Sequence, residues 1–125
     1  MSHPVPTSIE SAPHYRWGGG CDGWHLVQAG GLSVLQERMP PGTSEARHRH
    51  SVARQFFYVL QGELELELAG VRHRLGPHIG LEVPPATPHQ ARNRSGAYVE
   101  FLVISQPPSH DDRLPAEPLD GKAAG

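Results

Sequence analysis

Three histidines with strand-like spacing are the clearest chemical feature of this chain. His48 and His50 lie one residue apart, and His89 follows in a later segment, after a proline-rich turn. Successive side chains on a β-strand point to opposite faces, so His48 and His50 can project into the same space. Imidazoles that converge on one point are typical ligands of a divalent transition metal. The spacing makes the chain a candidate metalloprotein, and the alternative is a pair of surface histidines in a loop that also holds Arg47 and Arg49.

The segments around these histidines have the patterns of β-strands. Residues 63–68 alternate between Glu and Leu, and residues 71–75 alternate again after an Ala-Gly turn, which predicts a hairpin with one solvated face. Further strands are expected over 24–28, 32–39 and 79–83, together with two continuously apolar strands over 56–60 and 99–104. The 14 Gly and 13 Pro favour short elements joined by turns. We therefore expect an antiparallel sandwich or barrel.

The 125 residues are enough for one domain. Residues 1–13 are rich in Ser and Pro without periodicity and are expected to form a flexible N-terminal arm. Residues 14–105 form the predicted barrel domain, and residues 106–125 the predicted Pro-rich C-terminal tail, disordered or lying over the surface.

Composition excludes several classes of protein. A net charge of -2 gives no general basic surface for nucleic acid. No window is apolar enough to span a bilayer, and residues 1–13 lack the apolar stretch of a signal peptide, so no membrane partner is expected. The single cysteine, Cys21, excludes an internal disulfide and fits a reducing compartment. A cytoplasmic protein is expected.

Two separated motifs resemble those of the cupin superfamily. The first motif is Gly42-x5-His48-x-His50-x4-Gln55-x6-Gly62, in which the family places Glu where this chain has Gln55. The second is matched more loosely by Pro84, His89 and Asn93, with Ala86 where the family usually has Gly. The resemblance covers about residues 30–105. It implies an all-β fold, a mostly antiparallel double-stranded β-helix (jelly-roll) barrel of six to eight strands, with a metal inside the barrel mouth.

The resemblance also implies a set of metal ligands. His48, His50 and His89 would bind one divalent transition metal (Ni, Zn, Fe, Mn or Cu), and Gln55 occupies the fourth ligand position. An amide oxygen is a weak neutral ligand, so Gln55 either binds the ion or hydrogen-bonds within the pocket. A neutral ligand set leaves the ion its full charge, which should favour anionic ligands and weaken metal affinity relative to a Glu form.

Strand alternation extends the site to neighbouring residues. Phe57 and Val59 share a face with Gln55 and are expected to line the pocket. Asn93 lies four residues after His89, and it either faces the pocket or closes a turn by bonding backbone. For the strand over residues 32–39, alternation does not decide which face meets the pocket. Arg38 lies on one face and Glu37 on the other. Arg38 on the pocket side would anchor an anion.

Two classes of function fit these features. The first is a metal-dependent enzyme acting on a small organic molecule. Among the reactions that the resemblance implies, we prefer a dioxygenase, because three His ligands leave positions open for substrate and oxygen. An isomerase, lyase or polyketide cyclase is the alternative. The second class is a noncatalytic binding or sensor module, which the missing carboxylate ligand favours. A homodimer is expected, because two strands are apolar on both faces and cupins are commonly dimers.

Overall fold

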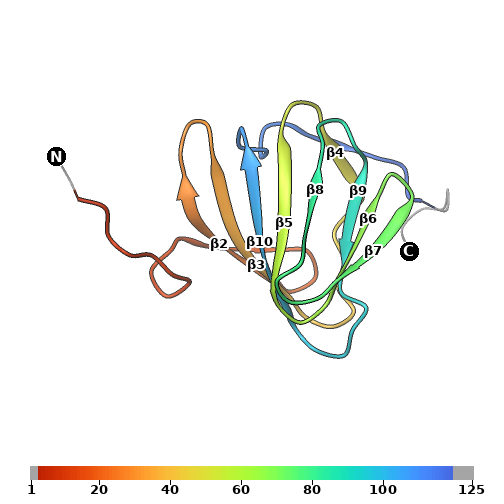
Figure 1. Cartoon of the computed structure of the whole chain (residues 1–125), viewed down its shortest axis with the longest axis horizontal. Coiled ribbons are helices and arrows are strands. Elements are labelled where there is room, and N and C mark those ends of the chain that lie inside the picture. Colours follow the sequence, from red (N-terminus) through yellow and green to blue (C-terminus); the bar gives the residue numbers. More distant parts are fainter. Residues whose placement is uncertain (1–2, 120–125) are drawn as a thin grey trace.

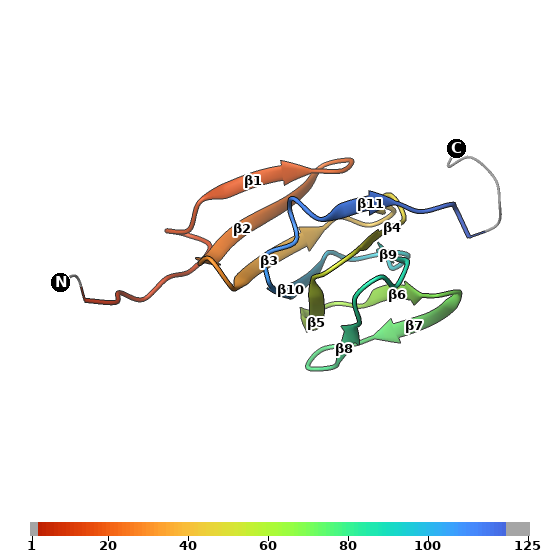
Figure 2. The ribbon, with the colours of Figure 1, turned by 90° about the horizontal axis from the view of Figure 1, so that it is seen from above.

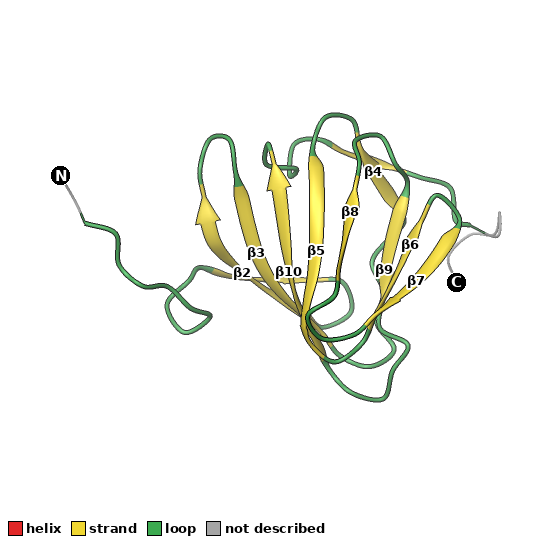
Figure 3. Ribbon diagram, in the orientation of Figure 1, coloured by secondary structure: helices red, strands yellow, loops and turns green. Residues whose placement is uncertain are grey.

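Two antiparallel sheets face each other in the computed structural model, which describes residues 3–119. Six strands pair in the order β1-β2-β3-β10-β5-β8, and five in the order β11-β4-β9-β6-β7. The strands converge at one end of the molecule and spread apart at the other (Figures 1 and 3). No helix occurs among residues 3–119, and so none there has the length and apolar character to cross a membrane. The predicted all-β double-stranded β-helix is confirmed.

The strand bounds follow the predicted patterns closely. The strands are β1 His14–Trp17, β2 Cys21–Gln28, β3 Ser33–Met39, β4 His48–His50, β5 Arg54–Gln61, β6 Leu64–Leu68, β7 Val71–Leu75, β8 Gly80–Val83, β9 His89–Arg92, β10 Val99–Gln106 and β11 Arg113–Pro115. The eleven strands of residues 3–119 exceed the six to eight that the resemblance implies. β1 and β11 are the unexpected ones, because each lies in a segment without clear alternation. β1 forms a hairpin with the adjacent β2, and β11 is held by pairing with the distant β4.

The core lies between the sheets and consists of inward-facing residues from both. Leu64 and Leu66 of β6 are fully buried, as is Phe101 of β10. Gly62 joins β5 to β6 with a φ of +83°, and a side chain there would overlap the carbonyl oxygen of Tyr98. The last glycine of the first motif is therefore needed for both backbone conformation and space.

One part of the β6–β7 prediction is wrong. Glu67 was expected on the solvated face, but its side chain is 3% exposed. Arg47 donates two hydrogen bonds of 2.7 and 2.9 Å to the Glu67 carboxylate, and the Gly70 amide donates a third of 2.7 Å. Arg47 also donates to the carbonyl of Glu117, so the described end of the chain lies beside this pair. The partner is remote in sequence, and strand alternation alone gives no sign of it.

The C-terminal segment crosses the spread end of the barrel. In Figure 1 it leaves β10 and passes along the top of the molecule to β4, and Figure 2 shows β11 beside β4. β11 pairs with β4, with Arg113 opposite His50. The Asp112 carboxylate accepts hydrogen bonds of 2.8 to 2.9 Å from the amides of Ser51, Val52 and Ala53. The described part of the predicted tail, residues 106–119, is thus bound to the barrel, whereas the N-terminal segment extends away from it (Figure 1).

Candidate metal centre

The three histidines meet at the barrel mouth. β4 supplies His48 and His50, β9 supplies His89, and the backbone pairing of the two strands sets His48 opposite His89. Their potential ligand nitrogens all lie within 4.8 Å of one another. The ring centroids are 4.4 Å apart for His48 and His89, and 4.9 Å apart for His48 and His50. All three side chains are buried.

Backbone carbonyls orient two of the imidazole rings. His48 Nδ1 donates to the Ala46 carbonyl at 2.8 Å, and His89 Nδ1 donates to the Thr87 carbonyl at 2.9 Å. In each case the acceptor lies two residues earlier, and the bond leaves the Nε2 lone pair free. A hydrogen bond at the far nitrogen is the usual way in which proteins orient a metal-binding histidine.

Burial keeps the imidazoles neutral. It lowers the pKa of His48 to about 3 and the pKa of His89 to about 4, and it also lowers the pKa of His50. A protonated imidazole has no lone pair to offer, so neutral rings are the form that binds a cation. The site is therefore ready for a metal at neutral pH.

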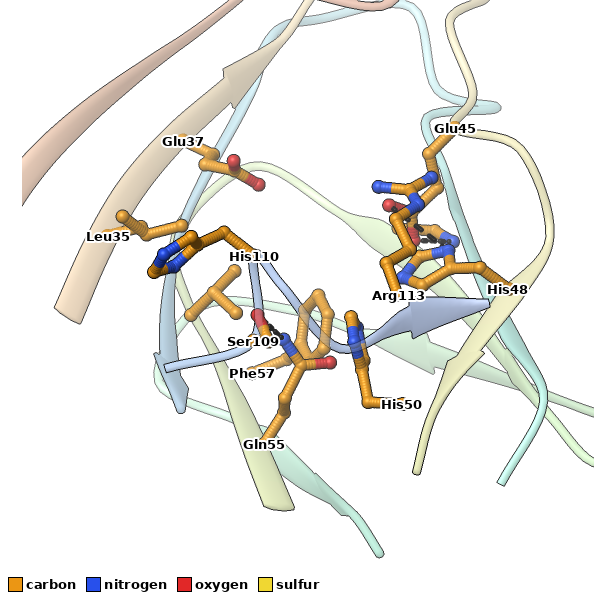
Figure 4. Close-up of a pocket in the computed structure, with 12 residues that line it drawn as sticks. Leu35, Glu37, Glu45, His48, His50, Gln55, Phe57, Ser109, His110 and Arg113 are labelled. Carbon is orange, nitrogen blue, oxygen red and sulfur yellow. Dashed lines mark hydrogen bonds and ion pairs between the residues drawn. The ribbon is translucent and has the colours of Figure 1, made fainter. Parts of the chain in front are cut away.

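Gln55 points its carbonyl oxygen toward His50 (Figure 4). Its amide nitrogen donates to Ser105 Oγ at 3.1 Å and to Ser109 Oγ at 3.4 Å. Its Oε1 is buried and accepts no hydrogen bond from the described residues. The two alternatives that the sequence left open are thus compatible, because one end of the amide bonds to serines while the other stays available as a ligand.

Unpartnered buried atoms show that the site fits a cation. Among residues 3–119, the buried side-chain nitrogen and oxygen atoms without a hydrogen-bond partner are His50 Nδ1 and Nε2, Gln55 Oε1 and His89 Nε2. Leaving such atoms unsatisfied costs about 1–3 kcal/mol each, so their clustering at one point needs a reason. His89 Nε2, Gln55 Oε1 and one of the two His50 ring nitrogens can each supply an electron pair, and a divalent transition metal would satisfy this nitrogen-rich set.

A cavity of about 110 Å³ opens beside the histidines. Figure 4 shows its lining, which comes from both sheets and from the C-terminal segment. The cavity is lined by Leu35, Glu37, Glu45, His48, His50, Gln55, Phe57, Ala91, Val103, Ser109, His110 and Arg113. It is smaller than the 300–1,000 Å³ of drug-sized pockets, so a ligand held here is small or extends toward solvent.

Glu37 is a cavity residue held by a tyrosine two strands away. Tyr15 pairs with Gly23 on the neighbouring strand, and Gly23 pairs with Glu37. Any side chain at position 23 would overlap the Tyr15 ring, so the glycine lets the tyrosine cross β2. Tyr15 Oη donates to Glu37 Oε2 at 2.5 Å. Burial raises the pKa of Glu37 to about 7 despite this bond.

Glu45 is the second carboxyl group of the cavity. Its Oε2 accepts a 3.0 Å hydrogen bond from the Ala91 amide, and its Oε1 lies 3.9 Å from His48 Nδ1. Burial, with a smaller contribution from Glu37, raises the pKa of Glu45 to about 8. The cavity thus combines neutral imidazoles with carboxyl groups that gain or lose a proton near neutral pH.

Three residues predicted to line the pocket do not line it. Arg38 lies on the opposite face of β3, where it bonds Glu100 at 3.2 to 3.3 Å and stacks over Trp24. Val59 is fully buried in the core below the cavity lining. Asn93 lies past β9, where it bonds backbone carbonyls, which is the second of the two roles that the sequence left open. Phe57 does line the cavity, and Glu37 takes the place expected of Arg38.

Some missed residues left a readable signal. Ser105 continues the inward-facing series Val99, Phe101 and Val103, so it is a polar residue on a core face and marks a site. A glycine within a strand, as at Gly23, often marks a close approach by another group. Arg113 left no such signal, because only the pairing of β11 with β4 brings it to the mouth.

Comparison with known proteins identifies relatives of this fold. Residues 35–105 match the family described as Cupin domain. KdgF from Halomonas sp. superposes with a TM-score of 0.78 at 21% identity, over 87% of this chain and 98% of that one. A sugar phosphate isomerase of the cupin superfamily from Silicibacter pomeroyi gives 0.74 at 23% identity, over 83% and 76%. The polyketide cyclase RemF from Streptomyces resistomycificus gives 0.73 at 20% identity, over 83% and 80%. No curated protein matches the sequence.

Proposed function

Since the chain belongs to the Cupin domain family, we propose that it is a metal-dependent enzyme that moves a proton on a small organic molecule in the barrel cavity. The observation that carries this proposal is the Glu37 carboxyl group, which lines the same cavity as the histidines. A general acid or base works best when its pKa lies near the working pH. Burial brings the pKa of Glu37 to about 7, which meets that condition.

Each group has a role in this proposal. His48, His50, His89 and Gln55 would hold the ion, whose positive charge, when bound, polarises an oxygen of the substrate and makes the neighbouring C–H bond more acidic. Glu37 takes the proton from that carbon and returns it at another position. Tyr15 keeps the carboxylate oriented through its hydrogen bond to Oε2. Leu35, Phe57 and Val103 supply the apolar wall that limits access of water.

This assignment favours isomerase, lyase or cyclase chemistry. The similarity to a sugar phosphate isomerase and a polyketide cyclase supports it only through the shared fold, because both identities are below 25%. A dioxygenase remains the second candidate, since three His ligands leave metal positions open. It needs no carboxyl base, so a role for Glu37 in turnover separates the two reactions.

Hydrogen–deuterium exchange tests the proposal. Wild-type protein and Glu37→Gln, both loaded with Zn²⁺, are incubated in D₂O with pyruvate or dihydroxyacetone, and loss of the C–H signal is followed by NMR. We expect the wild type to accelerate exchange and Glu37→Gln to lose about 10²- to 10⁴-fold of that rate with unchanged metal content. Glu82→Gln, at an exposed carboxylate on β8, is the matched control.

The pH profile gives the sign of the effect. Glu37 acts as a base only when ionised, so exchange should rise with pH through its pKa. A bound dication lowers that pKa below the value of about 7 in the metal-free protein. The midpoint of the rise in exchange rate should therefore lie below pH 7. Equal exchange in wild type and Glu37→Gln would refute the proposal. Oxygen consumption without exchange would favour the dioxygenase, and ligand binding without either would favour the noncatalytic module.

The homodimer stays a prediction with a structural basis. Phe56 and Tyr58 of β5, with Leu102 and Ile104 of β10, form an apolar stretch on the outer face of the six-stranded sheet, and Phe56 is 38% exposed. We propose that a second copy covers this face, and a monomer mass by light scattering would contradict it. The cytoplasm is likewise proposed only from the presence of a single cysteine, Cys21.

A further inference from the structure

Arg113 is a cavity residue without an ionic partner. Arg38, Arg47 and Arg94 each pair with a glutamate. By contrast, the guanidinium of Arg113 forms no ion pair within residues 3–119, and Nη2 donates a long bond of 3.4 Å to the Ala46 carbonyl. Among the described residues that line the cavity, Arg113 is the one arginine. A guanidinium with free donors at a ligand cavity is suited to a planar anion.

The position of Arg113 is well fixed although its side chain is exposed. Its backbone pairs with that of His50, so the arginine is registered against a proposed metal ligand. On one side, Asp112 holds the segment through three backbone amides. On the other, the Ala116 amide donates to the Arg47 carbonyl at 3.1 Å. The guanidinium therefore starts from a rigid base beside the histidines, which limits the entropy lost when a ligand binds.

The surrounding carboxyl groups select among anions. Glu37 and Glu45 lie on the same cavity as Arg113 and are not paired with it, and Arg113 appears beside Glu45 and His48 in Figure 4. A compact monoanion can use the guanidinium while leaving the Glu37 carboxyl group to donate or accept a proton. A highly charged anion such as a phosphate ester would be repelled more strongly by the carboxyl oxygen atoms that share the cavity.

We propose that Arg113 binds the carboxylate of the substrate, which makes the substrate a small organic acid with an oxygen next to its carboxylate that faces the histidines. This proposal rests on the proposed function, which places the substrate beside the histidines, and it adds the chemical class of the substrate. It also assigns to the C-terminal segment a part in ligand selection. The family motifs do not include this arginine.

Binding of pyruvate and of its neutral amide tests the proposal. Both ligands are titrated by calorimetry into Zn²⁺-loaded wild type, Arg113→Gln, Arg113→Lys and Arg72→Gln. Arg72→Gln removes the same charge from an exposed site on β7. We expect Arg113→Gln to weaken pyruvate binding roughly 10- to 100-fold with little change for pyruvamide, because a charge-assisted bond is lost. Arg113→Lys should lie between, and Arg72→Gln should match the wild type.

The outcomes separate this inference from the proposed function. Unchanged preference for pyruvate over pyruvamide in Arg113→Gln overturns the role of Arg113, whatever Glu37 does in the exchange assay. Equal weakening of both ligands also overturns it, because the effect would not depend on charge. Absence of pyruvate binding to the wild type rejects the substrate class. Metal content is measured for every variant, so loss of the metal centre is seen directly.

Discussion

Two buried amides at opposite ends of the barrel show how differently the protein treats a structural and a functional polar group. Asn93 lies beyond β9 and uses its full bonding capacity. Its nitrogen donates to the carbonyls of Met39 and Ala97 at 2.8 Å, and its oxygen accepts from Ser95 N and Oγ. Gln55, at the end crossed by the C-terminal segment, bonds to the rest of the described chain only through its nitrogen.

The difference teaches where to look for chemistry. A buried polar group is normally satisfied, because an unmade hydrogen bond in the interior is costly. Asn93 follows this rule and ties the 39–43 and 93–97 loops together. Around Gln55 the rule is broken at several atoms at once, because ring nitrogens of His50 and His89 and the Gln55 Oε1 are all buried without a partner in the described structure. The end of the barrel with unsatisfied polar groups holds the candidate metal site, and the end with satisfied polar groups has a structural role.

The largest expected effect is the loss of the metal centre. His89→Ala removes a buried ligand that the surroundings cannot replace, so metal content should fall from near one ion per chain to background. Mass spectrometry of chelator-free protein measures it, with His73→Ala, a half-buried histidine on β7, as the control. Stoichiometric metal in His89→Ala would show that the histidines do not form the site.

The next largest effect should come from removing the hydrogen bonds of Asn93. Asn93→Ala leaves the buried carbonyls of Met39 and Ala97 without their donor, and we expect a loss of about 2–4 kcal/mol in the free energy of unfolding. Urea denaturation of the metal-free protein measures this. Metal affinity of the folded variant should stay within about twofold of the wild type. A large drop in affinity would contradict the division between support and site.

The smallest effect should come from the serine that orients Gln55. Ser105→Ala removes the shorter of the two bonds to the amide nitrogen, and metal affinity should fall roughly 10-fold. Ser105→Thr retains a hydroxyl and should recover affinity. Ser95→Ala, which removes a comparable bond from Asn93, should leave affinity unchanged. If the two alanine variants lower affinity equally, Ser105 is not a positioning residue for the metal.

Much of the fold and part of the site could be predicted because they depend on local periodicity. Alternation in residues 63–68 and 71–75 predicted β6 and β7, since side chains on a strand must take alternate faces. The same rule put His48 and His50 on one side of β4. His89 came from its place in the second motif, and β9 does bring it opposite His48.

The faces of β3 show where this reasoning ends. Alternation says that Glu37 and Arg38 point in opposite directions, but not which of them meets the cavity. The pairing of β3 with β2 and β10 turns Glu37 inward and leaves Arg38 to Glu100 and Trp24. The face of β3 that turns inward is the one whose burial removes more apolar surface from water, and this depends on the packing of the whole sheet.

The sequence by itself determined the all-β class, the three histidines and the amide beside them, because strand alternation and the two family motifs depend on residues close together in the chain. Only the tertiary structure decided the rest of the cavity. Tyr15 reaches Glu37 across Gly23, Ser105 turns the Gln55 amide, and Arg113 arrives through the pairing of β11 with β4. These contacts join residues far apart in the chain, and no local pattern records a pairing whose free energy comes from the assembled barrel.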